Sequence, residues 1–180
     1  YTGEDRFPGL EDCDGVILLG YHAMAGTPGA ILEHTMSSAT VQNYWINGRK
    51  AGEVAIDAGI AGEKGKPVIM VSGDDKVCAE AGEWLPGVTT AEVKKGITWK
   101  GGMLLPPEKA YARIREKAKE AVGRLGERKP LVFDKPVRLR VERTERGLLP
   151  LSYSKPYMKI IDGRTYEVEG STTEEALFRL

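Results

Sequence analysis

Residues 15–53 of the chain read GVILLGYHAMAGTPGAILEHTMSSATVQNYWINGRKAGE. The run from Val16 to Leu19 is apolar and lies between glycines, which predicts a strand buried on both faces. His22 follows shortly after this strand, and the loops that leave the strands of an open α/β sheet line the crevice where ligands bind. The same stretch holds the second histidine, His34, and ends at Glu53. We therefore expect a functional site at this edge of the sheet.

The two histidines do not by themselves specify a metal site. They are twelve residues apart and lack the H-x-x-x-H spacing that places two ligands on one helix face, so loops would have to bring them together. An interior histidine that is merely hydrogen-bonded is the competing interpretation. The glycines and proline at 26–29 allow a close bend around a ligand, but no lysine follows Gly29, so the pattern of a phosphate-binding loop is not met.

Two strand–loop–helix units follow one another and predict an α/β layer with a largely parallel sheet. The first helix is expected from Gly52 to about Glu63, with Glu53 in its first turn, where the helix dipole alone would favour a carboxylate. The second strand, Pro67 to Ser72, leads into Asp74 and Asp75. One of these aspartates is expected to cap the next helix, and a role in a pocket is the alternative.

The rest of the sequence agrees with the α/β prediction and predicts a smaller α+β portion after it. Asn47-Gly48 predicts a tight turn after a strand at 41–46, and Asp162-Gly163 predicts a hairpin. Ser171 and Glu174 have the spacing of a capping box, which predicts the start of a helix. Gly101-Gly102 marks the expected internal boundary. We therefore predict an α/β catalytic domain over residues 1–100 and an α+β portion over residues 101–180.

The amino-acid composition limits the kinds of molecule that we expect this chain to bind. The 26 basic residues balance 26 acidic ones, so we expect neither nucleic acid nor an anionic membrane surface as a partner. No apolar run approaches the ~20 residues that a membrane-spanning helix needs. Cys13 and Cys78 lack the C-x-x-C spacing of redox or metal motifs, which favours a reducing, cytoplasmic location.

Three ordered blocks, LGYHAMAGTPGAILEHTM, INGRKAGEVAIDAGIAG and PVIMVSGDD, resemble the zinc-dependent D-aminopeptidases, the DppA type of metallopeptidase. The resemblance implies that His22 and Glu53 are zinc ligands and that His34 is the catalytic histidine. It further implies a two-zinc site in the complete protein, removal of N-terminal D-residues from short peptides, and assembly into a ring-shaped homo-oligomer.

The chain also departs from this family. The family begins with a strand that ends in an Asp-x-Glu metal-binding pair and supplies another histidine ligand before GYHA, and neither has a counterpart here. We therefore expect a piece that lacks the amino-terminal metal-binding segment and the end of its last helix. By itself such a piece should hold zinc weakly and show no peptidase activity until that segment is supplied. A non-catalytic oligomerisation or interaction module derived from the family is the alternative function.

Overall fold

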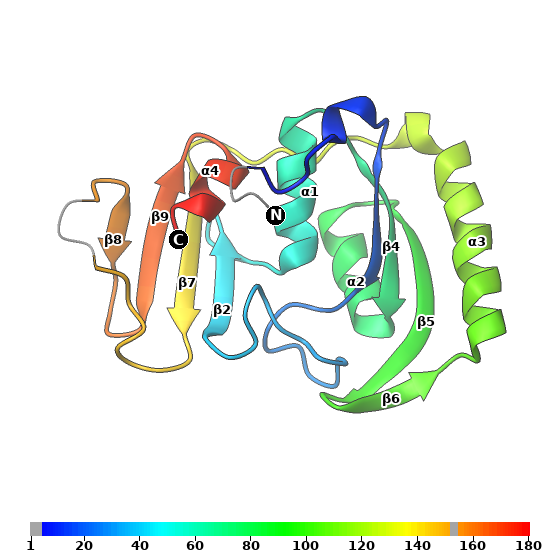
Figure 1. The fold of residues 1–180 in the computed structure, drawn as a ribbon, viewed down its shortest axis with the longest axis horizontal. Helices are drawn as coiled ribbons and strands as arrows, with labels where there is room; N and C mark the ends of the chain where they lie inside the picture. The colour runs from blue at the N-terminus through cyan, green and yellow to red at the C-terminus, as the bar shows by residue number, and fades with distance from the viewer. Residues whose placement is uncertain (1–4, 152–154) are drawn as a thin grey trace.

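The computed structural model describes residues 5–151 and 155–180, whose strands form two sheets (Figure 1). The first three strands of sheet A are parallel, and the fourth is antiparallel to the third. In order across the sheet, sheet A consists of β1 (Val16–Tyr21), β4 (Val68–Asp74), β5 (Thr89–Thr98) and β6 (Gly101–Leu104). The predicted α/β class with a largely parallel sheet is confirmed.

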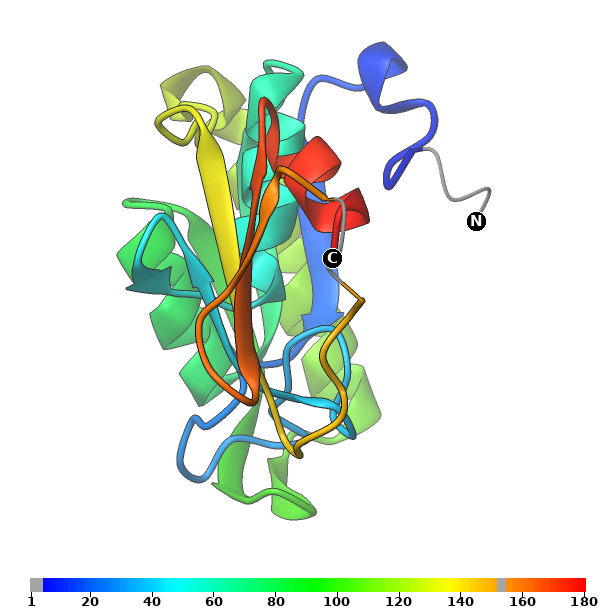
Figure 2. The same ribbon diagram turned by 90° about the vertical axis from the view of Figure 1, so that its left-hand side faces the viewer.

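Sheet B is antiparallel throughout, and Figure 2 views it from its β8 edge. In order across the sheet, it consists of β3 (Arg49–Lys50), β2 (Val41–Ile46), β7 (Val137–Arg143), β9 (Thr165–Gly170) and β8 (Met158–Ile160). The β2–β3 turn carries φ angles of 48° at Asn47 and 84° at Gly48. Two successive left-handed residues match the right-handed twist of the flanking strands, so the predicted Asn-Gly turn is confirmed.

The two sheets do not follow the boundary expected at residue 101. Strands β2 and β3 precede that boundary, yet they belong to sheet B, where β2 pairs with β7, a strand that begins at Val137. Gly101 itself begins β6, which forms a hairpin with β5. The division into portions 1–100 and 101–180 stays a proposal, and both sheets draw strands from each side of it.

Helices fill the space between the sheets and cover the far face of sheet A (Figure 1). Helices α1 (Glu53–Glu63) and α2 (Asp75–Trp84) share one core with sheet B, whereas α3 (Pro107–Gly123) packs on the opposite face of β4 and β5. The shorter helices are α4 (Thr173–Phe178), η1 (Leu10–Asp12) and η2 (Leu125–Glu127). Among the described residues, none of the helices has the length and apolar character that a membrane span requires.

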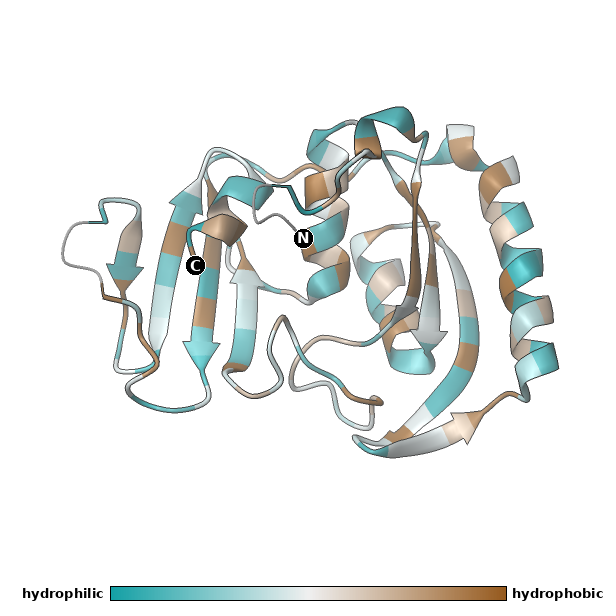
Figure 3. Cartoon of the chain, viewed as in Figure 1, coloured by the Kyte–Doolittle hydropathy of each residue, from teal (hydrophilic) through white to brown (hydrophobic). Residues whose placement is uncertain are grey.

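Strand β7 shows how the sequence pattern fixes a face of the core. Val137, Leu139 and Val141 are buried, and each such side chain contributes about 1.5–3 kcal/mol by leaving water. The intervening arginines point outward, where Arg138 pairs with Glu169 and Arg140 with Glu167 on β9. The alternation is visible along β7 in Figure 3. Period-two patterning therefore sets both the register and the buried face of sheet B.

Strand β1 is not buried on both faces, contrary to the expectation from its apolar sequence. Leu18 is 2% exposed, but Ile17 is 39% exposed and Leu19 is 61% exposed. The reason is position, because β1 pairs only with β4 and forms the edge of sheet A in the described part of the chain. An apolar run does not distinguish an edge strand from a central one.

Helix α4 begins one residue later than the expected capping box. The side chain of Thr172 accepts a hydrogen bond from the Glu175 N–H at 3.0 Å, and the Glu175 carboxylate accepts one from the Ser171 N–H at 2.6 Å. Thr172 and Glu175 have the same spacing as the expected pair, so the sequence offered two overlapping boxes.

Asp74 is confirmed as the cap of α2. It is fully buried, and its two carboxylate oxygens accept the backbone N–H groups of Val77 at 2.9 Å and Ile31 at 2.8 Å. The second bond ties the loop that carries His34 to the carboxyl end of β4. Asp75 accepts the Gly96 N–H at 2.8 Å and so links the first turn of α2 to β5.

We expect Asp74→Ala to lower the free energy of unfolding by about 3 kcal/mol, because it removes a helix cap and leaves two backbone N–H groups without their acceptor. Asp74→Asn is the matched control, since its amide oxygen retains one acceptor and should cost less than half as much. Urea denaturation followed by circular dichroism measures both. A loss below about 0.5 kcal/mol in Asp74→Ala would show that the cap contributes little.

Candidate metal centre

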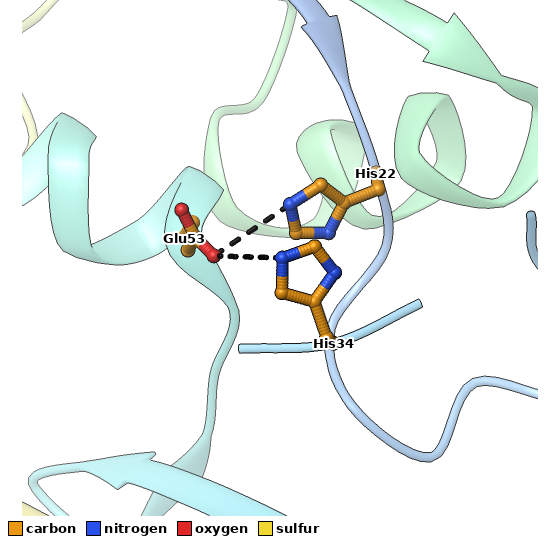
Figure 4. Close-up of side chains that lie close together, drawn as sticks. All are labelled: His22, His34 and Glu53. Carbon is orange, nitrogen blue, oxygen red and sulfur yellow. Dashed lines mark ion pairs between the residues drawn. The ribbon is translucent and has the colours of Figure 1, made fainter. Parts of the chain in front are cut away.

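Three separate segments bring His22, His34 and Glu53 together (Figure 4). His22 directly follows β1, His34 lies in the loop before β2, and Glu53 is the first residue of α1. The Nε2 atoms of His22 and His34 lie 3.6 Å and 3.7 Å from Glu53 Oε1. Sequence reasoning singled out all three residues, and the structure places them in one cluster.

The backbone fixes how each imidazole presents its nitrogens. His34 Nδ1 lies 2.7 Å from the Leu32 carbonyl, and His22 Nδ1 lies 3.2 Å from the Ala23 carbonyl. A carbonyl only accepts hydrogen bonds, so these contacts place the proton of each neutral ring on Nδ1 and leave the Nε2 lone pair directed at the cluster. The rings are stacked, with centroids 3.7 Å apart and an interplanar angle of 16°.

The donor set fits a zinc ion. Two imidazole nitrogens and one carboxylate oxygen lie within 4.8 Å of one another, and they are partly exposed at the end of a sheet. Catalytic zinc takes three such protein ligands and keeps a fourth position for water or substrate. A metal-bound histidine also donates its other ring N–H to a carbonyl or carboxylate, as both rings do here.

The loop that carries His34 is held in a strained conformation. Leu32 and Met36 have φ angles of 53° and 64°, which are unfavourable for residues with a side chain. The loop is fixed from three directions, by Asp74 at Ile31, by a Thr35 hydroxyl that accepts the Ala25 N–H at 3.1 Å, and by Glu53 Oε1, which accepts the Met36 N–H at 2.8 Å. Strain that the surroundings hold in place is common at functional sites.

A second polar group lies one helical turn behind Glu53. Asp57 is buried and accepts hydrogen bonds from the Tyr21 hydroxyl at 2.5 Å and from the Arg6 guanidinium. Arg6 Nη2 also lies 3.6 Å from Glu53 Oε2. Burial and the neighbouring Asp57 carboxylate raise the pKa of Tyr21, so this phenol stays protonated and donates to Asp57. Our sequence reasoning missed this group, although the spacing of four from Glu53 to Asp57 was a signal for a shared helix face.

Glu80 joins the His22 loop to the start of α1. Its Oε2 accepts the Met24 N–H at 2.7 Å, and its Oε1 is buried without a hydrogen-bond partner among the described residues. A Cβ at Gly52 would lie 2.5 Å from Glu80 Oε1, so only glycine permits this approach. Burial raises the pKa of Glu80 to about 7, the Met24 N–H opposes the shift, and Glu83 adds to it.

The similarity of the chain to known proteins shows its family. Residues 7–180 match the D-aminopeptidases of peptidase family M55. The chain belongs to the D-aminopeptidase family. A D-aminopeptidase of Bacillus subtilis (strain 168) is 39% identical over 159 residues, which are 87% of this chain and 57% of that protein. The resemblance drawn from the three sequence blocks is therefore confirmed.

A solved structure supports the same assignment. The Zn-dependent D-aminopeptidase DppA from Bacillus subtilis, described as a self-compartmentalizing protease, matches with a TM-score of 0.86 and 33% identity. The match covers 94% of this chain and 61% of the DppA chain. This member of the D-aminopeptidase family thus spans somewhat more than half the length of its relatives. The roles of His22, Glu53 and His34 stay predictions, which the cluster supports by bringing the three side chains together.

We expect the raised pKa of Glu80 to make the metal-free protein less stable as pH rises. The carboxyl binds its proton more tightly in the folded state, so its contribution is complete below pH 4.5 and is lost as pH rises through about 7. The shift from 4.5 corresponds to about 3 kcal/mol between pH 4.5 and pH 8. Glu80→Gln should lack this component of the pH dependence while keeping an acceptor for the Met24 N–H.

The measurement is urea denaturation at pH 5 and pH 8 in the presence of a chelator. Glu116→Gln is the control, because it removes an exposed carboxylate from α3 that does not act on Glu80. Wild-type and Glu116→Gln proteins should lose stability in parallel, and Glu80→Gln should diverge from both. Three parallel profiles would show that Glu80 has an ordinary pKa.

Proposed function

We propose that this chain carries part of the active site of a zinc-dependent aminopeptidase that removes the N-terminal, D-configured residue from short peptides. The observation that carries the proposal is the cluster of His22, His34 and Glu53. Membership of the D-aminopeptidase family and the zinc dependence of the DppA relative support it. The proposal extends to a two-zinc site in the whole protein, to which His22 and Glu53 would contribute ligands.

His22 and Glu53 would hold the metal from two rigid elements. His22 is fixed by the end of β1, and Glu53 is fixed by a helix whose residues 54–62 are all buried. A bound zinc ion supplies a Lewis acid that polarises a carbonyl and lowers the pKa of water towards about 7. The protein contributes the placement of these ligands, which leaves the side facing the crevice open for a peptide.

His34 would act on protons rather than on the metal. Its Nδ1 proton is occupied by the Leu32 carbonyl, so Nε2 is free to accept a proton from an attacking water and to return it to the leaving amine. Stabilisation of the tetrahedral intermediate is the second role that a protonated His34 would support. Because Nδ1 contacts the Leu32 carbonyl, Nε2 is the atom that would accept the proton in the first step.

Assembly into a homo-oligomer and a cytoplasmic location belong to the same proposal. The description of the DppA relative as self-compartmentalizing supports assembly, and so does an apolar hairpin on this chain. Ile97, Met103 and Leu104 of the β5–β6 hairpin are 59%, 66% and 68% exposed. An exposed apolar group of this kind is typical of a surface that another protein covers. Cys13 and Cys78 are both free, which fits a reducing compartment.

We expect His34→Ala to retain its zinc while kcat falls by at least about 100-fold, the usual scale for loss of an acid–base group. The measurement is release of D-Ala from a D-Ala dipeptide by the protein at its full natural length, with zinc determined by elemental analysis. His22→Ala is the matched control and should lose zinc together with activity. Loss of zinc from His34→Ala would make His34 a ligand, and unchanged turnover would remove it from the mechanism.

We expect Glu53→Gln to weaken zinc binding by about 100-fold or more, because the neutral amide replaces a charged ligand. Glu108→Gln is the matched control, since it removes a carboxylate from the first turn of α3, where only the helix dipole is affected. Competition with a chromophoric chelator measures both affinities. Equal zinc affinities in the two variants would favour the helix-dipole explanation of Glu53.

A further inference from the structure

A cavity of about 390 Å³ adjoins the metal cluster on the side of sheet B. Met36 and Arg6 line this cavity, and both contact Glu53. Its walls are mainly apolar and are formed by side chains of β2, β7 and α4, among them Val41, Val141 and Leu177. We name this space the β2–β7 pocket. The pocket therefore lies one residue away from Glu53, and its volume is in the range that small ligands occupy.

Two hydrogen-bond donors in the wall of the β2–β7 pocket have no acceptor. The hydroxyl of Tyr44 and the Nε atom of Arg143 are buried without a hydrogen-bond partner among the described residues. Tyr44 is only 1% exposed, so its hydroxyl does not obtain a partner from bulk solvent. Buried polar groups in native proteins are normally satisfied, so two unpaired donors on residues that line a cavity are candidates to bind the acceptor atoms of a ligand.

The charge of Arg143 points to the chemistry of that ligand. Its other nitrogens contact neutral oxygens, the Tyr166 hydroxyl at 2.7 Å and the Thr40 hydroxyl at 3.4 Å. No carboxylate lies within 4.0 Å of its guanidinium in residues 5–151 and 155–180. Tyr166 is satisfied, since its hydroxyl accepts from Arg143 and donates to the Leu180 carbonyl at 3.4 Å. Arg143 therefore offers a cationic donor without an acceptor, and Tyr44 offers a neutral one. This pair of donors suits an anion with two oxygens.

We propose that the β2–β7 pocket binds the carboxyl-terminal residue of a short peptide, with Arg143 and Tyr44 holding its free carboxylate and the apolar walls holding its side chain. This inference rests on the proposed function, because it assumes that the peptide amino end lies at the metal cluster. It makes Arg143 and Tyr44 specificity-determining residues and assigns the substrate class as short peptides with an apolar last residue and an unblocked carboxylate.

The geometry explains why such a site would select short peptides. A carboxylate fixed at Arg143 and an amino-terminal residue fixed at Glu53 define a span from the metal cluster to the pocket, so a longer chain would have to leave the pocket or lose the ion pair. A carboxylate that pairs with a partly buried arginine gains more than a neutral amide, which lacks the charge and offers a single acceptor. The ratio of kcat/KM for a peptide with a free carboxylate to kcat/KM for its amide therefore measures the contribution of the pocket.

The test compares D-Ala–D-Leu with D-Ala–D-Leu amide as substrates of the full-length protein loaded with zinc. The wild type should favour the free acid in kcat/KM by about 10- to 100-fold, mainly through KM. In Arg143→Gln this ratio should fall to about 1, and Tyr44→Phe should reduce it several-fold while keeping the aromatic ring in the core. Each variant is compared with itself, so partial loss of folded protein does not alter the ratio.

Arg138→Gln is the matched control, because Arg138 lies on the same strand but faces solvent and pairs with Glu169. It should retain the wild-type ratio. A wild-type ratio near 1, or an Arg143→Gln variant that keeps the wild-type ratio, would overturn the inference.

A second measurement separates this inference from the proposed function. Isothermal titration calorimetry of the chelator-treated protein with D-Ala–D-Leu and with its amide reports binding without hydrolysis. Binding that requires the carboxylate and Arg143, without turnover in the zinc-loaded protein, would support the pocket and contradict the peptidase. Equal turnover of acid and amide would support the peptidase and contradict the pocket. Absence of any binding preference for the acid would likewise overturn the pocket.

Discussion

The carboxylate of Glu53 is the point on which the site depends. It is 16% exposed, and removing a charge from water is costly unless other groups compensate it. The positive end of α1, the Met36 N–H and the Arg6 guanidinium provide part of the compensation. The remaining oxygen surface faces the Nε2 atoms of His22 and His34. A cation bound between these atoms would compensate the carboxylate charge further.

Local chemistry explains what could be read from the sequence. The alternation in β7, the Asn47-Gly48 turn and the capping role of Asp74 depend on residues close together in the chain, and each was predictable. The exposure of β1 was not, because it depends on which strands pair across the sheet. The predicted start of α4 was wrong by one residue, because the pairs Ser171–Glu174 and Thr172–Glu175 have the same spacing.

The residues of the candidate site also differ in whether the sequence could reveal them. His22, His34 and Glu53 were found through the resemblance to a family, since neither spacing nor periodicity predicted their convergence. Arg6 and Asp57 are 51 residues apart, and Met24 and Glu80 are 56 residues apart. Tyr44 and Arg143 lie on the paired strands β2 and β7 of sheet B, where Tyr44 pairs with Val141 and Arg143 pairs with Val41. Contacts at such separations follow from the packing of two sheets around α1, so a single sequence without its fold does not reveal them.

The two halves of the site are positioned in different ways. Glu53 stands on a helix buried between the sheets, and His22 directly follows β1, so their relative positions are set by the core. His34 instead lies between two residues with left-handed backbone angles, in a loop held by a few hydrogen bonds. Metal ligands and proton-transfer groups both need a fixed geometry. The core fixes the proposed ligands Glu53 and His22, whereas hydrogen bonds made by Asp74, Thr35 and Glu53 fix the loop of His34, whose proton-transfer role stays a prediction.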